Sequence, residues 1–206
     1  MAATAKSSNI TKIQPQEGPQ EQFLSTSADI AIYGGAAGGG KTYGLLMEPI
    51  RHQNNPDFGG VVFRRTSPQI HNEGGLWDTS EELYQHLDAR PKSHISEWVF
   101  PSGSKIKFNH LQHEKNILDW QGSQIPYIGF DELTHFTEKQ FFYLLSRNRS
   151  TCGVKPYMRA TCNPVPPSDP VGGWIHKLIG WWIDDRKRVD GKENENYGLP
   201  RMERTG

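Results

Sequence analysis

Short apolar runs alternate with helix-like stretches through the central part of the chain. Four of these runs are bounded by turn residues and predict buried strands: residues 30–33, 61–63, 125–130 and 157–161. A turn-rich Pro-Ser-Gly-Ser segment separates residues 98–100 from residues 105–108 and predicts a β-hairpin. Helices are expected after the first strand and over residues 137–147, where Thr137 and Gln140 match a capping box. This alternation predicts an α/β fold, with a mostly parallel sheet flanked by helices and a β-hairpin insertion.

The two ends of the chain differ in composition from its centre. Residues 1–18 contain no aromatic side chain and predict a flexible N-terminal arm. Residues 19–183 hold the apolar runs and predict a single domain. Residues 184–206 carry twelve charged side chains, six of each sign, and predict a solvated linker or tail.

A glycine-rich segment joins the first predicted strand to the helix that follows it. The segment contains a Gly-x4-Gly-Lys-Thr pattern, which is typical of phosphate-binding loops. Glycines allow backbone N–H groups to converge on a phosphate, the lysine adds positive charge and the threonine hydroxyl can bind Mg²⁺. The alternative is a glycine-rich surface loop, which the flanking strand and helix disfavour. The candidate nucleotide-binding residues are Gly35, Ala36, Ala37, Gly38, Gly39, Gly40, Lys41 and Thr42.

Two adjacent carboxylates follow the apolar run at residues 125–130. Asp131 is expected at the strand tip, where it can complete the shell of a Mg²⁺ ion beside Thr42. Glu132 comes next and can polarise an attacking water. The alternative is an acidic cap at a helix N-terminus, but the coupling to a glycine loop favours catalysis. The sequence contains no guanine-reading Asn-Lys-x-Asp loop, so ATP is favoured over GTP.

Another predicted strand ends in polar residues. Thr161 and Asn163 lie at the end of the run at residues 157–161, followed by a proline. A polar side chain at such a strand tip can sense whether a γ-phosphate is present. An ordinary strand-to-loop turn explains the Asn-Pro pair equally well.

Composition and charge exclude several classes of protein. The chain has 206 residues, with 23 Lys plus Arg and 23 Asp plus Glu, so its formal net charge is zero. This excludes a histone-like or polybasic protein that binds by net charge alone, and any nucleic-acid contact must come from a local patch. No apolar run approaches the ~20 residues of a membrane helix, and Cys152 and Cys162 lack metal-ligand spacing. A soluble cytosolic protein is therefore expected.

The motifs together are similar to those of a known family. They comprise the glycine loop, Phe-Asp-Glu-Leu-Thr at 130–134, Phe-Arg-Arg-Thr at 63–66, Ser-Arg-Asn-Arg-Ser at 146–150 and Ala-Thr-Cys-Asn-Pro at 160–164. In this order they resemble the ATPase domain of the large terminase subunit of tailed bacteriophages, over roughly residues 14–183. The resemblance implies a P-loop NTPase fold of the additional-strand catalytic-glutamate (RecA-like) type, with residues 19–183 as the ATPase domain.

The resemblance implies roles for the residues around the phosphates. Lys41 and Thr42 would bind the triphosphate of ATP and Mg²⁺. Asp131 would complete the metal shell through water. Glu132 would be the catalytic carboxylate.

Two further roles rest on the same resemblance. Thr161 and Asn163 would belong to the coupling motif that links hydrolysis to movement. Gln20 would hydrogen-bond adenine, as an upstream glutamine does in the family. The alternative for Gln20 is a solvated glutamine, because other glutamines crowd the same arm.

One departure concerns the residue that would complete the site from a neighbouring subunit. Some terminases place an arginine finger just before a glycine, eleven residues upstream of the catalytic glutamate, where this chain has Gln121. A finger, if there is one, must then come from elsewhere. The candidate arginines are Arg64, Arg65, Arg147 and Arg149. Any of them could instead be a helix C-terminal cation or a DNA contact.

The second departure is length. The family's nuclease domain would begin where this chain ends, so we expect a motor half without nuclease activity. The implied function is ATP hydrolysis that drives viral double-stranded DNA into a preformed capsid. The implied partners are this DNA, the portal protein, the small terminase subunit and further copies in a ring, in the host cytoplasm and transiently on the procapsid, without a membrane role.

Two other functions would share the nucleotide motifs. Another P-loop DNA translocase or helicase should carry further motifs, which this length does not hold. A nucleotide-binding interaction module would bind partners without turnover. For DNA contact, Lys105 and Lys107 of the predicted hairpin are candidates, although lysines that protect an edge strand are the favoured interpretation.

Overall fold

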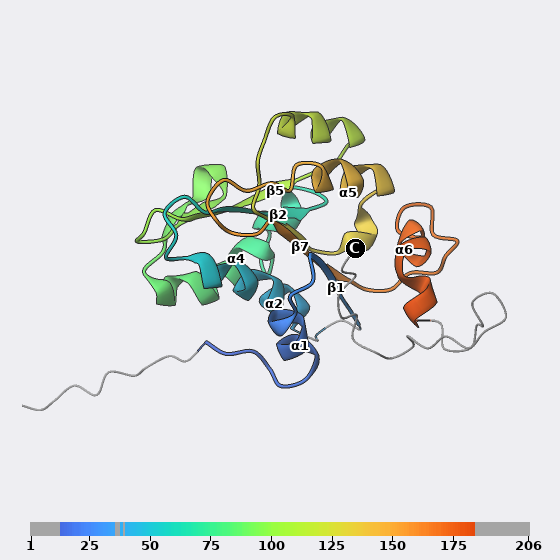
Figure 1. Ribbon diagram of the computed structural model, residues 1–206, viewed down its shortest axis with the longest axis horizontal. Coiled ribbons are helices and arrows are strands. Elements are labelled where there is room, and N and C mark those ends of the chain that lie inside the picture. Colours follow the sequence, from blue (N-terminus) through green and yellow to red (C-terminus); the bar gives the residue numbers. More distant parts are fainter. Residues whose placement is uncertain (1–12, 36–37, 39, 184–206) are drawn as a thin grey trace, which may run out of the picture.

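The structure is a computed structural model that describes residues 13–35, 38 and 40–183 (Figure 1). The predicted tail at 184–206 and the first twelve residues of the predicted arm lie outside this range. Residues 13–18 belong to the described part, and Ile13 packs against the apolar core. No helix among the described residues has the length and apolar character needed to span a membrane.

A seven-stranded, mostly parallel sheet forms the centre of the molecule (Figure 1). The strand order is β1-β7-β6-β2-β5-β4-β3, and the first five strands in this order pair in parallel. The strands are β1 (Ile30–Gly34), β2 (Gly59–Arg64), β3 (Arg90–Lys92), β4 (Glu97–Val99), β5 (Lys105–His110), β6 (Tyr127–Phe130) and β7 (Tyr157–Cys162). This is the α/β architecture that the alternating apolar runs predict, and its mostly parallel sheet agrees with the P-loop fold that the resemblance implies.

Helices cover both faces of the sheet (Figure 1). The α-helices are α1 (Pro19–Ser25), α2 (Lys41–Met47), α3 (Pro68–His71), α4 (Leu76–Tyr84), α5 (Glu138–Leu145) and α6 (Trp174–Ile183). Short 3₁₀ segments connect them: η1 (Glu48–His52), η2 (Gln85–Leu87), η3 (Ser93–Ile95), η4 (Glu114–Trp120) and η5 (Leu133–His135). Helices α1, α2 and α4 lie on one side, and α5 and η4 on the other.

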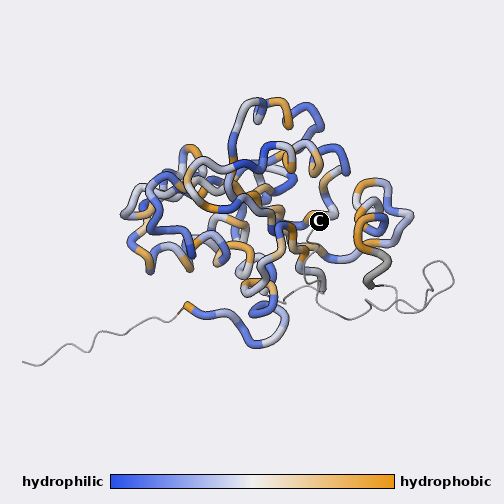
Figure 2. Tube along the Cα trace, viewed as in Figure 1, coloured by the Kyte–Doolittle hydropathy of each residue, from blue (hydrophilic) through white to orange (hydrophobic). Residues whose placement is uncertain are grey.

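The alternation of side chains along each strand divides the apolar core in two. Val62 of β2 packs in the core under α2 and α4, whereas its neighbours Val61 and Phe63 pack in the core under α5 and α6. Apolar stretches accordingly run along the central strands in Figure 2. Because both faces are covered, the central strands read as continuous apolar runs, and this made them predictable from the sequence.

The predicted hairpin is present, but its place in the sheet differs from the expectation. Residues 97–99 and 105–110 form the antiparallel pair β4–β5, with Gly103 at a φ of +101° in the turn. Strand β5 also pairs in parallel with β2, and β3 forms the edge. The interpretation of Lys105 and Lys107 as protection of an edge strand is therefore wrong, because β5 has a neighbour on each side.

The predicted helix at residues 137–147 corresponds to α5, which ends at Leu145. Its capping box is formed: the Thr137 side chain accepts from the backbone N–H of Gln140 at 3.3 Å, and the Gln140 side chain accepts from the N–H of Thr137 at 3.0 Å. The box satisfies two N–H groups that a helix start leaves unpaired. It fixes where the chain leaves the carboxyl edge of the sheet.

Candidate nucleotide-binding site

The polar residues predicted from the sequence gather at one edge of the sheet. Strands β1, β2, β6 and β7 run parallel, so their carboxyl ends lie at the same edge. Gly35, Arg64, Asp131 and Asn163 lie at or just after these four ends. Ligands of open parallel sheets bind at this edge, outside the carboxyl ends of the strands.

The glycine loop connects β1 to α2 at this edge. Gly40 directly precedes α2 with a φ of +64°, and a Cβ there would lie 2.9 Å from Nε2 of Gln20. Glycine is favoured here because it adopts a positive φ without strain and has no Cβ that would displace Gln20. Ala36, Ala37 and Gly39 lie outside the described residues, so their contacts with phosphate remain predictions.

Lys41 crosses the mouth of the glycine loop. Its ammonium donates to the carbonyl oxygen of Gly35 at 2.9 Å and to Oδ1 of Asn163 at 3.0 Å, and the residue is only 7% exposed. The charge is thus held between the end of β1 and the residue that follows β7. An anion in the loop would meet a lysine that is already positioned.

Asp131 is the most enclosed acid of the site, with no exposed surface. Its carboxylate accepts from the hydroxyl of Thr42 at 3.1 Å and from that of Thr161 at 2.6 Å. The guanidinium of Arg64 lies 2.6 Å from the other carboxylate oxygen. These donors surround a charge that would otherwise be costly to bury.

Glu132 has an unusual backbone conformation for a side chain of its size. Its φ and ψ are 60° and 63°, in the left-handed region. Its N–H donates to Oγ1 of Thr161 at 3.1 Å, and its carboxylate accepts from Nδ2 of Asn163 at 3.2 Å. Backbone of this kind costs about 1–3 kcal/mol and is concentrated at functional sites.

Asn163 therefore connects the phosphate lysine to the second acid. Its amide oxygen accepts from Lys41 while its amide nitrogen donates to Glu132. Asn163 and Thr161, at the carboxyl end of β7, together contact Lys41 and both acids, although Asn163 lies 122 residues after Lys41 and both lie about 30 after the acids. This arrangement favours a functional interpretation of the Asn-Pro pair over an ordinary turn.

The thiol of Cys162, at the end of β7, is buried beside these residues. Burial, with a smaller contribution from Glu132, raises the pKa of Cys162 to about 11. The thiol stays protonated at neutral pH and is a poor nucleophile.

A magnesium ion fits the donor set at this edge. The Thr42 hydroxyl and the Asp131 carboxylate lie 3.1 Å apart and offer the oxygen ligands that Mg²⁺ prefers. Such ions keep several waters, so an acid that acts through water needs no direct metal contact.

Gln20 lies against the glycine loop and is 2% exposed. Its Nε2 donates to the carbonyl oxygen of Gly40 at 2.8 Å, and its Oε1 accepts from the N–H of Gln16 at 2.7 Å. The interpretation of Gln20 as a solvated arm residue is therefore wrong. Its contact with adenine remains a prediction.

Two of the candidate arginines, at the end of β2, have contacts within this chain. Arg64 pairs with Asp131, an interaction that the sequence analysis missed. The pairing of β2 with β6 explains this contact: Phe63 lies opposite Phe130, so the residues that follow them, Arg64 and Asp131, are neighbours at the ends of the two strands. Arg65 instead donates to the carbonyl of Leu111 at 2.9 Å and to the side chain of Gln140 at 3.0 Å, which fits a structural role.

The other two candidates, Arg147 and Arg149, lie near the amino ends of the parallel strands, away from the candidate site. The carbonyl of Arg147 accepts from the N–H of Ile125, just before β6 begins, and its guanidinium lies over the ring of Tyr143. Arg149 is exposed, as is Gln121 after η4. Neither arginine approaches the site of its own chain, so a finger role toward a neighbouring subunit remains a prediction.

Comparison with protein families gives the assignment. Residues 32–205 match the model of "Terminase large subunit, T4likevirus-type, N-terminal". The chain belongs to the terminase large subunit family. No curated protein sequence matches it.

Solved terminase structures share the fold. The large terminase of a thermophilic bacteriophage matches with a TM-score of 0.61 at 14% identity, over 83% of this chain and 44% of that one. The HK97 bacteriophage large terminase matches with a TM-score of 0.58 at 14% identity, over 85% and 37%. The N-terminal domain of the DNA packaging ATPase from bacteriophage phi29 matches with a TM-score of 0.55 at 15% identity, over 79% and 84%. The chain thus spans less than half of the two large terminases.

Proposed function

We propose that this chain is the ATP-hydrolysing part of a terminase motor that packages viral double-stranded DNA into a preformed capsid. The proposal rests on the convergence of Lys41, Thr42, Asp131 and Glu132 at one edge of the sheet, in a family member. The thermophilic bacteriophage terminase with this fold has been solved with ADP and with ATP-gamma-S. An adenine nucleotide in the glycine loop is therefore the expected ligand.

The triphosphate would be bound by the glycine loop and by Lys41. Backbone N–H groups between Gly35 and Gly40 would contact the phosphates, as in other phosphate-binding loops. Lys41 would exchange its hydrogen bonds to Gly35 and Asn163 for phosphate oxygens. Gln20, which already contacts the carbonyl of Gly40, would lie close enough to bind adenine.

Thr42 and Asp131 would hold Mg²⁺, with Asp131 acting through water. The ion supplies charge neutralisation at the phosphate oxygens when it is bound. For Asp131 to serve, one of its present donors has to give way to a water. Arg64 is the donor that can leave, because its side chain is 18% exposed whereas Thr161 is fully buried.

Glu132 would orient and polarise the attacking water. Its carboxylate accepts from the side-chain amide of Asn163, whose oxygen in turn accepts from Lys41. A phosphate that draws Lys41 away would free the amide oxygen of Asn163, so that the amide could turn and weaken the hydrogen bond that its nitrogen donates to Glu132. Thr161 and Asn163 would in this way carry the state of the nucleotide to the catalytic acid, in the role of a coupling motif.

The complete motor would contain more than this chain. We propose a ring of copies docked on the portal protein of the procapsid in the host cytoplasm, with the small terminase subunit and DNA as further partners. An arginine of a neighbour would complete the transition state, and Arg147 and Arg149 remain candidates. Because such a finger is worth about 10³–10⁵ in rate, an isolated copy should be a poor ATPase.

The proposed function predicts that Glu132→Gln abolishes turnover but preserves nucleotide binding. Removing the carboxylate takes away the group that polarises water, so ATP hydrolysis should fall at least about 10²-fold. The measurement is phosphate release by the chain assembled with portal and DNA, alongside calorimetric binding of ATP-γ-S.

Glu138→Gln is the matched control, because Glu138 is an exposed acid at the start of α5. Equal hydrolysis by wild type and Glu132→Gln would show that Glu132 is not the catalytic acid. Binding without hydrolysis in the wild-type assembly would instead favour a nucleotide-dependent interaction module.

A further inference from the structure

The antiparallel end of the sheet has one apolar and one polar face. Trp98, Ile106 and Phe108 are each at most 2% exposed and pack in the core with α4. The residues between them are half-buried or exposed and point to the other face. This polar face consists of Arg90, Lys92, Glu97, Val99, Lys105 and Lys107, and we call it the basic face.

The register places these side chains in a grid. Arg90 pairs with Val99 and Val99 with Lys105, while Lys92 pairs with Glu97 and Glu97 with Lys107. Side chains on paired residues share a face, and the Lys92–Glu97 ion pair at 3.2 Å agrees with this. Residues two apart along a strand are about 6.6 Å apart and adjacent strands about 4.8 Å, so the whole grid measures roughly 10 Å across.

The basic face carries a strong local charge on a chain with no net charge. It has four cations and one acid. Glu97 pairs with Lys92, whereas Arg90, Lys105 and Lys107 form no ion pair within the described part of the chain. Neighbouring cations of the grid are about 7–10 Å apart, close to the Debye length of about 8 Å at physiological salt, so their fields add in part.

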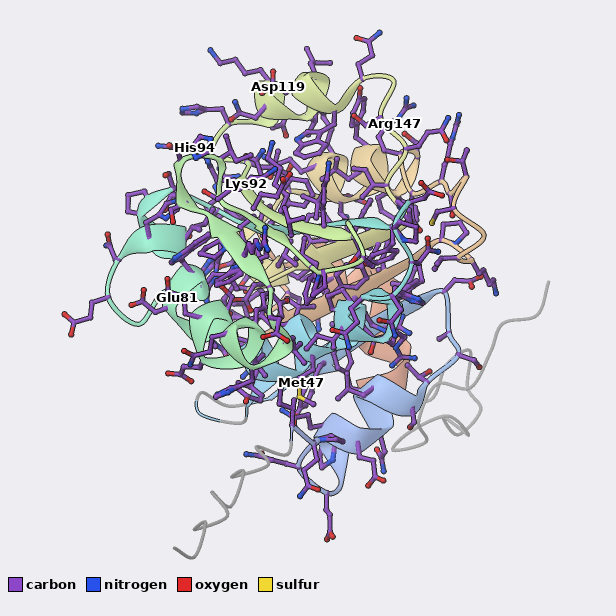
Figure 3. The ribbon with its side chains drawn as sticks, turned by 90° about the vertical axis from the view of Figure 1, so that its left-hand side faces the viewer. Met47, Glu81, Lys92, His94, Asp119 and Arg147 are labelled. Atoms are coloured by element: carbon purple, nitrogen blue, oxygen red, sulfur yellow. The ribbon has the colours of Figure 1, made fainter. Side chains whose placement is uncertain are left out.

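The basic face lies on the same side of the sheet as α5 and η4. Lys107 pairs with Val61, which packs in the core under α5 and α6. Beyond β5, toward the β3 edge, the face is open to solvent; Figure 3 views the molecule from this end, with Lys92 labelled. A partner can therefore approach the surface that these three paired strands form.

We propose that the basic face is where this chain contacts the phosphate backbone of double-stranded DNA. The inference rests on the proposed packaging function. Interfaces with DNA are more polar and more positively charged than those between proteins, which need an apolar or aromatic centre. The basic face offers one half-buried valine and four cations, so phosphates fit it better than a protein surface does.

The test is binding of a blunt DNA duplex to the full chain at several salt concentrations. Arg90→Gln/Lys105→Gln/Lys107→Gln should bind about tenfold or more weakly, and the slope of log K against log salt should fall by about 0.9 for each lost contact. Lys139→Gln/Lys155→Gln/Lys177→Gln removes the same charge from exposed lysines elsewhere and should bind like wild type.

A gain-of-function variant excludes misfolding as the explanation. Glu97→Gln removes the single acid of the basic face and should tighten DNA binding. If the triple variant of the face keeps wild-type affinity and slope, or the control variant loses them equally, the proposal is overturned. An acidic protein partner would then be the better fit.

Failure of the proposed function gives a different result. ATP hydrolysis by the portal-docked assembly, measured in parallel, reports on the motor itself. If wild type hydrolyses ATP and binds DNA but the triple variant binds equally well, only the basic face is wrong. If wild type neither binds the duplex nor hydrolyses ATP, the packaging function is overturned as well.

Discussion

Single hydrogen bonds determine how the candidate site is connected. The Thr161 hydroxyl donates to Asp131 and accepts from the N–H of Glu132, so one side chain holds both acids. The Asn163 side chain accepts from Lys41 and donates to Glu132, so it connects the lysine to the second acid. These five residues come from three separate segments of the chain, at residue 41, residues 131–132 and residues 161–163, yet each lies within hydrogen-bond distance of its partner. The site is thus largely preorganised.

At this scale, Lys41→Ala should remove nucleotide affinity and keep the fold. A hydrogen bond to a charged group contributes about 1.5–3 kcal/mol, so the Kd for ATP should rise by about 10–100-fold. Calorimetry measures the Kd, and circular dichroism with thermal unfolding reports on the fold. Lys139→Ala, on the exposed surface of α5, serves as the control. Unchanged ATP affinity would contradict the assignment of the glycine loop.

At the scale of elements, capping and strand order fix the edge that carries the site. Helix α5 begins six residues after Glu132, and its capping box sets its direction. Gln140 extends the box by donating to the carbonyl of Leu111 and accepting from Arg65. Through this residue the start of α5 is tied to the ends of β2 and β5.

Thr137→Ala should therefore destabilise the chain by about 0.5–2 kcal/mol, as the loss of a helix cap does. Urea unfolding followed by circular dichroism measures the change, and Thr137→Ser should restore most of it. A Thr137→Ala variant as stable as wild type would mean that packing alone holds α5.

The helices and strands differ in how well the sequence alone predicts them. Strands β2 and β6 are continuous apolar runs because helices cover both their faces, and α5 has a complete cap, so all three were predictable. Strand β3 is fully exposed and polar, which leaves no periodic pattern to read. The sheet order was also hidden, since it depends on long-range pairing. For that reason the Arg64–Asp131 ion pair and the inner position of β5 were missed.

At the scale of the molecule, a buried ion pair joins segments that are distant in sequence. Arg159 of β7 donates to the carbonyls of Thr26 and Ala28, and its Nε lies 3.4 Å from Oε1 of Glu48. Burial raises the pKa of Glu48, while the cations of Arg159 and Arg51 oppose this shift. The pair attaches the connection between α1 and β1 to the far end of the helix that follows the glycine loop.

Arg159→Met should lower the stability of the chain by up to about 3–5 kcal/mol at pH 7, because it leaves the buried Glu48 charge with the partly exposed Arg51 as its remaining ion-pair partner. The pKa of Glu48 would rise further above its unfolded value. Its contribution to stability is then fully present below the unfolded pKa and is lost as the pH rises through the folded pKa. The destabilisation should accordingly be smaller at pH 5 than at pH 7.

Urea unfolding at several pH values measures this dependence. Glu48→Met/Arg159→Met, which removes both charges, should be more stable than Arg159→Met at pH 7 and should lose its dependence on pH in this range. A loss of stability in Arg159→Met that is the same at both pH values would contradict the role given to Glu48.

The pairing of strand β2 has a mechanical consequence for the proposed packaging motor. One of its ends carries Arg64 against Asp131, and along its whole length it is hydrogen-bonded to β5, which bears Lys105 and Lys107. A pull on DNA held at those lysines, directed along the strands, would load this ladder in shear, so that several backbone bonds resist together. Tension on the DNA could then reach the proposed nucleotide site through the paired strands β5 and β2 and the Arg64–Asp131 ion pair.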